Sequence, residues 1–372
     1  MSDERPEPDR IEGAPHPRHT RHLIGQTAAE AEFQAAFTRG RLHHGWLITG
    51  PRGVGKATLA WRLARFLLTT PDSGGLFAAP PTSLDVPENH PVLPRINALS
   101  EPRLFLLRRP WDDKGDRLRA EITVDEVRKM KTYFTLSAAD GGQRVAIIDA
   151  VDEMNTNAAN ALLKLLEEPP ARVTLFLISH QPARLLPTIR SRCRTLRTLP
   201  LSAADLSDAL TAAGGDVAPE DRVALAELAG GSVGAAFQMT NLDGLKLYAT
   251  LIRLMATLPR LDRPMAQALA DQGAKKGAEA QFDLIVSLID LFLSRLARAG
   301  TLNMAAPEAA RGEAALIQRL SPDPQAARHW ADLAQTLGNR ARRGRAVNLD
   351  PAALLMDMVL KIDEVAGTLA QR

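Results

Sequence analysis

The stretch GPRGVGKAT, residues 50–58, carries residue types that bind phosphate groups. Gly50, Gly53 and Gly55 allow backbone amides to turn inward onto phosphate oxygens, and Lys56 adds a cation where β- and γ-phosphates would lie. The apolar run WLIT precedes the glycines, and the amphipathic stretch ATLAWRLARFLL follows them. This order of strand, glycine loop and helix predicts a P-loop that binds ATP or ADP. The alternative is a loop that persists only as a helix cap.

The position after the lysine lacks a group that a P-loop normally has. The residue there usually supplies a hydroxyl group to Mg²⁺, whereas Ala57 carries only a methyl group. Thr58 comes one position later, which turns its side chain about 100° around a helix. Thr58 therefore replaces the missing ligand only if the loop shifts.

A second apolar run, VAIIDA, ends in Asp149, a residue type that holds the magnesium shell in P-loop folds. In hydrolysing proteins of this arrangement a glutamate follows and orients the attacking water, but here Ala150 follows. Loss of a general base typically slows a reaction by about 10²- to 10⁴-fold. Asp152 and Glu153 lie beyond the strand and are expected to face elsewhere. We therefore expect nucleotide binding and ATPase activity of this chain to be weak or absent.

A third stretch, TIRSRCRTL, places Arg192 between Ser191 and Cys193 in a short turn. A guanidinium group on such a turn can stabilise the charge on a γ-phosphate bound to a neighbouring molecule. By composition alone, an ordinary surface arginine in an arginine-rich loop is the favoured interpretation. Cys193 is expected to be a small buried apolar residue rather than a nucleophile.

The elements that must position these residues alternate between apolar runs and helical periods from residue 23 to 200. Residues 46–49, 144–150 and 173–179 are predicted buried strands, and residues 155–168 are a predicted helix between the last two. Another helix is expected to begin at Thr123, because Glu126 follows three residues later as in a capping box. This alternation predicts an α/β domain built on a parallel sheet.

Two segments before residue 106 are predicted to be irregular. Residues 1–20 are rich in proline and charge and predict a flexible tail, in which solvated histidines are favoured over a metal site formed by His16, His19 and His22. Residues 70–105 contain many proline and glycine residues and predict an extended surface excursion.

Beyond residue 200 the pattern is helical. Ser202 with Asp205 opens one predicted helix, and Asp350 with Pro351 opens the last one. The run FDLIVSLIDLFL could supply contacts between subunits or be buried in its own domain. The basic stretch RARRGR, residues 340–345, could meet DNA or an acidic partner, but a solvated loop between helices is favoured.

Composition limits the classes of protein to which this chain can belong. The 372 residues are 45% hydrophobic and 4% aromatic, with a net charge of +3, which suits a globular, largely helical protein. The single cysteine excludes an internal disulfide framework and a thiolate-rich zinc site, and it suits the cytoplasm. The longest apolar stretch is interrupted by Asp283, Asp290 and Arg295, so no membrane partner is expected.

The segments GPRGVGKAT, VAIIDAVDEMNTNAANALLKLLEEPP and LLPTIRSRCR, in this order and spacing, resemble the AAA+ clamp-loader proteins of bacteria. NALLKLLEEPP and the SRC turn are the most specific part, and LIGQ at 23–26 is similar to the family's box before the P-loop. The resemblance covers residues 22 to about 245. In the C-terminal helices it is limited to their layout and to NLDPAALLMDM.

This resemblance implies a fold and three residue roles. The fold would be a RecA-like AAA+ parallel-sheet domain at 21–200, a small helical lid domain at 201–245 and a helical collar domain at 246–372. Lys56 and Asp149 take the Walker A and Walker B positions. Arg192, within its Ser-Arg-Cys turn, takes the position of the arginine finger that is offered to the ATP site of an adjacent gamma/tau subunit.

The sequence also departs from the family's pattern. Ala57 and Ala150 replace two catalytic positions, and Gly234 stands where the ATPases of the family usually carry a sensor arginine. The family's zinc-binding cysteines are absent, and the excursion at 70–105 takes their place, so zinc is not expected.

The resemblance finally implies a function. The chain would be a stator subunit of the DNA polymerase III clamp loader, in a hetero-oligomer with gamma/tau and delta subunits. The complex would load the sliding clamp onto primed DNA during replication, and any polymerase activity would belong to the larger assembly. Two alternatives stay open: an active gamma/tau-like ATPase motor that uses Thr58, and an AAA+ helper of DNA repair.

Overall fold

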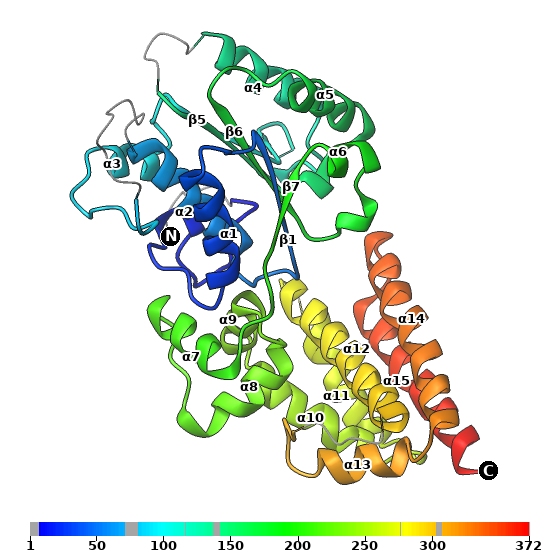
Figure 1. The fold of residues 1–372 in the computed structure, drawn as a ribbon. Coiled ribbons are helices and arrows are strands. Elements are labelled where there is room, and N and C mark those ends of the chain that lie inside the picture. The colour runs from blue at the N-terminus through cyan, green and yellow to red at the C-terminus, as the bar shows by residue number, and fades with distance from the viewer. Residues whose placement is uncertain are drawn as a thin grey trace. The chain divides into compact units, whose positions relative to one another are not determined.

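The computed structural model describes residues 7–70, 81–115, 117–136, 142–275, 277–302 and 307–371 (Figure 1). Contacts divide the chain into two compact units. Unit 1 contains residues 1–215 and 231–234, and unit 2 contains residues 216–230 and 235–372. The predicted boundaries at 200 and 245 therefore differ from this division, because the helix after residue 202 has its contacts in unit 1.

Unit 1 is built on a parallel sheet with the order β2-β5-β6-β1-β7. Its strands are β1 (Gly45–Thr49), β2 (Leu104–Arg108), β5 (Arg144–Asp149), β6 (Val173–Ser179) and β7 (Arg194–Arg197). The register pairs Arg108 with Asp149, and Thr49 with both Ser179 and Arg197. The carboxyl ends of the strands therefore meet at one edge of the sheet, where open α/β folds bind their ligands.

Helices cover both faces of this sheet (Figure 1). One face packs against α1 (Thr27–Thr38), α2 (Lys56–Thr69) and α3 (Val92–Asn97) in one apolar cluster. The other face packs against α4 (Val124–Leu136), α5 (Thr156–Glu167) and α6 (Pro187–Ser191) in a second cluster. Side chains alternate between the two clusters along a strand, as Trp46 and Leu47 do in β1. The α/β fold class predicted from the sequence is confirmed.

The three predicted strands and the helix at 155–168 correspond to β1, β5, β6 and α5. Two strands of this sheet were missed. In β7 only Leu196 is buried, so its arginine-rich sequence gives no apolar run. In β2 the strand begins inside the predicted excursion.

The prediction of an irregular excursion at 70–105 is wrong for its second half. Residues 71–80 lie outside the described residues, but α3 and the start of β2 are regular. Leu84, Val92 and Ile96 are buried against α2, so a few apolar residues between prolines are enough to fix this segment on the core. A short antiparallel pair, β3 (Trp111–Asp112) and β4 (Arg117–Leu118), follows β2.

The N-terminal segment also differs from its prediction. Among residues 7–20, predicted to be a flexible tail, His16 is 2% exposed and opens a short 3₁₀ helix, η1 (Pro17–His19). The ion pair of Asp9 with Arg108, 99 positions away, and the contact of Asp9 with His16 explain this, since they satisfy charges that composition alone suggests are solvated.

The C-terminal end of unit 1 and the whole of unit 2 are helical in the described residues. The helices after β7 are α7 (Ala203–Ala212), α8 (Arg222–Ala229), α9 (Val233–Asn241), α10 (Gly244–Ala256), α11 (Arg263–Ala274), α12 (Glu279–Leu302), α13 (Glu313–Leu320), α14 (Pro324–Ala346) and α15 (Pro351–Ala370). Ser202 caps α7 and Asp350 caps α15 as predicted, because each side-chain oxygen accepts a hydrogen bond from an amide of the first turn.

The apolar run in α12 and the basic stretch at the end of α14 take defined positions in unit 2. Phe282, Ile285, Ile289 and Phe292 of α12 are 2% exposed or less, so the run is buried in its own unit. Residues 340–345 belong to α14 rather than to a loop, which corrects the prediction. Three arginines there form ion pairs, Arg340 with Asp357, Arg342 with Asp290 and Arg345 with Asp283. Of the helices in the described part of the chain, none has the length and hydropathy needed to cross a membrane.

Candidate functional site

The glycine loop between β1 and α2 is held by close backbone contacts. A Cβ atom on Gly50 would lie 2.3 Å from Thr198 Oγ1, and one on Gly53 would lie 2.3 Å from Ser232 Oγ. Gly53 also has a φ of 73°, in the left-handed region that favours glycine. The loop therefore needs glycine at these positions for its own packing, whether or not a nucleotide binds.

Lys56 is the first residue of α2 and is 3% exposed. Its Nζ donates hydrogen bonds to the carbonyl oxygens of Gly50, at 2.8 Å, and Pro51. Burial lowers the pKa of Lys56 to about 8, while the nearby carboxylates of Asp149 and Asp152 act in the opposite direction. The lysine predicted to meet phosphate oxygens is thus satisfied by the carbonyls of its own loop.

The two residues after Lys56 differ in their surroundings. The methyl group of Ala57 packs against the apolar cluster formed by α1, α2 and the sheet. Thr58 lies one residue further along α2 and is partly buried. A role for Thr58 in binding magnesium stays a prediction.

Asp149 ends β5 and is 8% exposed. Burial raises the pKa of this carboxyl to about 7, and the charges of Asp9 and Glu153 add to the rise, whereas Lys56 and Arg108 oppose it. The carboxyl group predicted to take the Walker B position is therefore much less ready to carry a negative charge than an exposed one. A protonated carboxyl is a poor partner for Mg²⁺.

Sequence reasoning missed two residues near the loop. Asp152, expected to face elsewhere, accepts hydrogen bonds from Ser179 Oγ, at 2.7 Å, and from the amides of His180 and Gln181. Burial lowers the pKa of His180 to about 4, and the positive charges of Lys56 and Arg52 add to this effect. The position of His180 directly after the buried strand β6 could have identified it, because all strands of a parallel sheet end at the same edge.

The segment that begins α9 lies against the glycine loop. Ser232 Oγ donates to the carbonyl oxygen of Arg52 at 2.9 Å, and the Gly234 amide donates to that of Gly53 at 3.2 Å. Gly234 stands at the expected sensor position and offers no charged side chain there. These contacts fix the loop but add no group that binds phosphate through a side chain.

Arg192 forms the C-cap of α6 and is about one-third exposed, with 37% of its side-chain area accessible. Its Nη2 lies 2.8 Å from Glu167 Oε1 of α5, and its Nη1 donates to the carbonyl oxygen of Thr188. Lys56 and Arg192 have no hydrogen-bond or ion-pair partner in common among these contacts. The guanidinium group is partly accessible to solvent.

The neighbours of Arg192 in the turn have structural contacts. Ser191 Oγ donates to the carbonyl oxygen of Thr188 at 3.1 Å. Cys193 packs against the second apolar cluster, and burial raises its thiol pKa to about 12. In the described part of the chain, no group of three or more His, Cys, Asp or Glu residues could hold a metal ion.

Comparison with known proteins shows a similarity to one protein family over part of the chain. A family model described as DNA polymerase III, delta subunit, matches residues 25–202, which include the glycine loop, the sheet and the turn of Arg192. The match ends at the start of the helical region.

The chain is also similar to individual subunits of DNA polymerase III. DNA polymerase III subunit delta' of Pseudomonas aeruginosa is 38% identical over 152 residues, which are 40% of this chain and 41% of that protein. The subunit delta' of Escherichia coli is 30% identical over 226 residues, 60% of this chain and 62% of that protein. The subunit gamma/tau of Mycobacterium bovis is 30% identical over 181 residues, 46% of this chain and 27% of that protein.

The matched region spans between two fifths and just over three fifths of the two delta' relatives. It carries the loop, β5 and the arginine turn, on which the resemblance in sequence also depends. This region of the chain is therefore similar to the DNA polymerase III delta-subunit family, and proteins named delta' are among its relatives.

Proposed function

We propose that this chain is the delta'-type subunit of a bacterial clamp loader, where it acts as a stator and gives Arg192 to the ATP site of a neighbouring gamma/tau subunit. The observation that carries the proposal is a P-loop fold without its magnesium hydroxyl, in a chain whose relatives are named delta'. Ala57 packs its methyl group into the core, and Lys56 donates to carbonyls of its own loop. Such a module suits a subunit that supports another site better than one that hydrolyses ATP.

The position of Arg192 supports its role as a finger. The ion pair with Glu167 joins two partly exposed side chains, and such pairs contribute only about 0–1 kcal/mol. Little free energy is therefore lost when Arg192 leaves Glu167 to contact a γ-phosphate bound to a neighbouring subunit. The short helix α6 and the buried Ile189 fix the backbone from which the guanidinium group extends.

The partners follow from this proposal. The gamma/tau and delta subunits would complete the hetero-oligomer, with the helices after residue 245 forming its collar. The complex would open a sliding clamp and load it onto primed DNA in the cytoplasm. Nucleotide binding to this chain's own loop would be weak or absent, and zinc would not be needed.

The test is the ATPase activity of the reconstituted complex with Arg192→Ala. Turnover at the site that receives the finger should fall by about 10³-fold or more, while the complex assembles normally. Arg192→Lys should also be impaired, because a lysine cannot replace the planar guanidinium fork. The matched control is Arg190→Ala, which removes an exposed arginine two residues away. Unchanged ATPase in Arg192→Ala would refute the finger role.

The second candidate is a gamma/tau-like motor, favoured by the 30% identity to a gamma/tau relative. It requires the isolated chain to hydrolyse ATP. Turnover of about 1 per second or faster, abolished by Lys56→Ala, would establish the motor and exclude the stator. Co-purification with clamp-loader subunits separates both from a repair helper, which would be found without them.

A further inference from the structure

The N-terminal segment, residues 7–20, lies against the glycine loop. A Cβ atom on Gly234 would lie 2.6 Å from Ile11 Cδ1 and 3.0 Å from the Cα atom of Gly53. Gly234 also donates its amide to the carbonyl of Gly53. The side chain of Ile11 thus reaches the residues that hold the loop in place.

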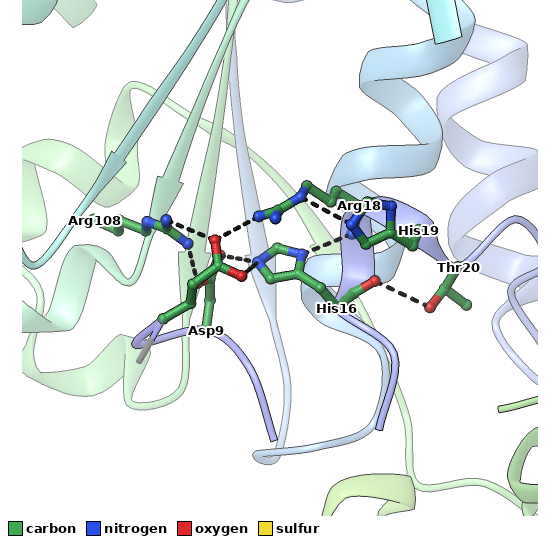
Figure 2. A network of polar contacts seen from close by, with 7 residues as sticks. Asp9, His16, Arg18, His19, Thr20 and Arg108 are labelled. Atoms are coloured by element: carbon green, nitrogen blue, oxygen red, sulfur yellow. Dashed lines mark hydrogen bonds and ion pairs between the residues drawn. The ribbon is translucent and has the colours of Figure 1, made fainter. Parts of the chain in front are cut away.

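A cluster of four charged residues and one histidine, Glu7, Asp9, Arg18, Arg108 and His16, ties the segment to the end of β2 (Figure 2). Arg108 contacts Asp9 Oδ1 at 2.5 Å and Glu7 Oε1 at 2.9 Å, and Arg18 contacts the same Glu7 oxygen at 2.6 Å. His16 Nε2 lies 3.0 Å from Asp9 Oδ2. The His16 Nδ1 accepts from the Arg18 amide, so the other ring nitrogen carries the proton toward Asp9.

The helix that follows the loop also holds the segment. Arg65 of α2 donates to the carbonyl oxygens of Arg18, at 2.9 Å, and Thr20, at 2.6 Å. The ring of His16 packs edge-on against Trp61 of the same helix, with centroids 6.2 Å apart. The side chains of Asp9 and His16 are each 2% exposed, so these contacts are buried. Buried charged contacts of this kind are costly to break singly.

The cluster brings the carboxylates of Glu7 and Asp9 to the carboxyl edge of the sheet, where open α/β folds bind their ligands. Arg108 is the register partner of Asp149 at the carboxyl edge of the sheet. The charges of Asp9 and Asp149 lie close enough to this edge to influence each other. Burial acts to raise the pKa of Asp9 itself, but its contacts with His16 and Arg108 hold the pKa below the usual value, so Asp9 stays ionised. A triphosphate at this edge would be repelled by the carboxylate of Asp9. Arg108 could not attract it freely, because its guanidinium group is already paired with Asp9 and Glu7.

We propose that residues 7–20 are an intrachain strap, which occupies the nucleotide face of the loop and competes there with nucleoside triphosphate. The strap is held by the charged cluster and by α2, and Ile11 covers the junction of Gly53 and Gly234. This proposal concerns the chain's own loop and is independent of the role of Arg192. In this arrangement the strap, rather than a magnesium-bound nucleotide, occupies the face of the glycine loop.

The test is the affinity of the full chain for ATP, measured by titration calorimetry with and without Mg²⁺. The double variant Glu7→Gln/Asp9→Asn removes the anions that pair with Arg108 and should bind ATP at least about 10-fold more tightly than the unmodified chain. Adding Lys56→Ala to the double variant should abolish the gain, which shows that it arises at the loop. The control is Glu88→Gln, which removes an exposed ion pair with Arg21 and should leave affinity unchanged.

Hydrogen exchange of residues 7–20 is the second measurement, and it does not depend on any variant. Two ligands that compete must displace each other, so saturating ATP should accelerate exchange in the strap. Slower exchange with ATP, weaker ATP binding by the double variant, or no ATP binding by either protein would overturn the proposal. Slower exchange or weaker binding by the double variant would mean that residues 7–20 help to form the nucleotide site. Absence of ATP binding by both proteins would mean that the strap is not what excludes nucleotide. The ATPase experiment on Arg192 would be unaffected by any of these results.

Discussion

Arg192 Nη2 lies 2.8 Å from Glu167 Oε1, an ion pair between the C-cap of α6 and the last residue of α5. Both side chains are partly exposed, at 37% and 48%. The pair orients the guanidinium group while leaving it accessible. It is therefore a resting contact that a stronger anion can replace.

Glu167→Ala tests this interpretation. Because an exposed pair contributes about 0–1 kcal/mol, the variant should change the ATPase of the assembled complex by less than about five-fold. The free energy of unfolding of the isolated chain should also fall by no more than about 1 kcal/mol. Glu168→Ala, at the next exposed position, is the control. A loss as large as that of Arg192→Ala would mean that Glu167 itself serves the neighbouring site.

Asp149 predicts a pH dependence of stability. Its folded-state pKa, raised to about 7, lies above the ordinary value of 3.8 for an aspartic acid, so the folded chain keeps a proton that the unfolded chain has released. This contribution is complete at low pH and is lost as pH rises toward 7. Asp149→Asn has no proton to release at this position, so its stability lacks this dependence on pH. Between pH 5 and pH 7 the free energy of unfolding of the variant should therefore rise by about 1–3 kcal/mol relative to that of the unmodified chain.

Urea unfolding at several pH values measures that difference. Asp208→Asn, which changes an exposed carboxylate of α7, is the control and should follow the unmodified chain. If the two curves for Asp149→Asn and the unmodified chain stay parallel between pH 5 and pH 7, the carboxyl is ionised in the folded state.

In unit 2, Glu313 accepts hydrogen bonds from three groups. Its Oε1 accepts from Arg295 Nε, at 2.7 Å, and from Tyr248 Oη, at 2.5 Å, and its Oε2 accepts from the Ala309 amide. Glu313 is 0% exposed and the Arg295 side chain 7%. Glu313→Ala removes the buried carboxylate of this network and leaves the Arg295 guanidinium only the more distant Glu227, at 3.4 Å, and the Pro307 carbonyl, so it should reduce the free energy of unfolding by about 3–5 kcal/mol.

Tyr248→Phe removes only one hydrogen bond of this network and should cost about 1 kcal/mol. Denaturant unfolding of both variants checks the order of the two effects. A cost below about 1 kcal/mol for Glu313→Ala would show that water replaces the lost carboxylate.

Cys193 is the one cysteine of the chain, so its reactivity can be measured directly. Burial raises the pKa of the thiol to about 12, and the thiolate is the reactive form. Alkylation at pH 8 should therefore be at least about 10-fold slower in the folded chain than in urea. Equal rates would place the thiol in contact with solvent.

Sequence alone could predict the parts of this protein that are encoded by neighbouring residues. The glycine loop, the strands β1, β5 and β6, and the caps Ser202 and Asp350 depend on patterns within a few residues. Apolar periodicity and capping act locally, so they can be read without the fold. The departures at Ala57 and Ala150 are likewise visible in the sequence.

Only the tertiary structure decided which distant groups meet. It placed β7 at an edge of the sheet, paired Arg108 with Asp9 across 99 positions of the chain, and turned Asp152 toward the end of β6. A charged residue has no periodic signal, and its surroundings depend on which segments fold against it. The sequence thus determined the strand, glycine loop and helix of the phosphate-loop framework. Long-range contacts decided that residues 7–20 lie against that framework. The physical reason is that a charged residue can be buried only where folding brings it a partner.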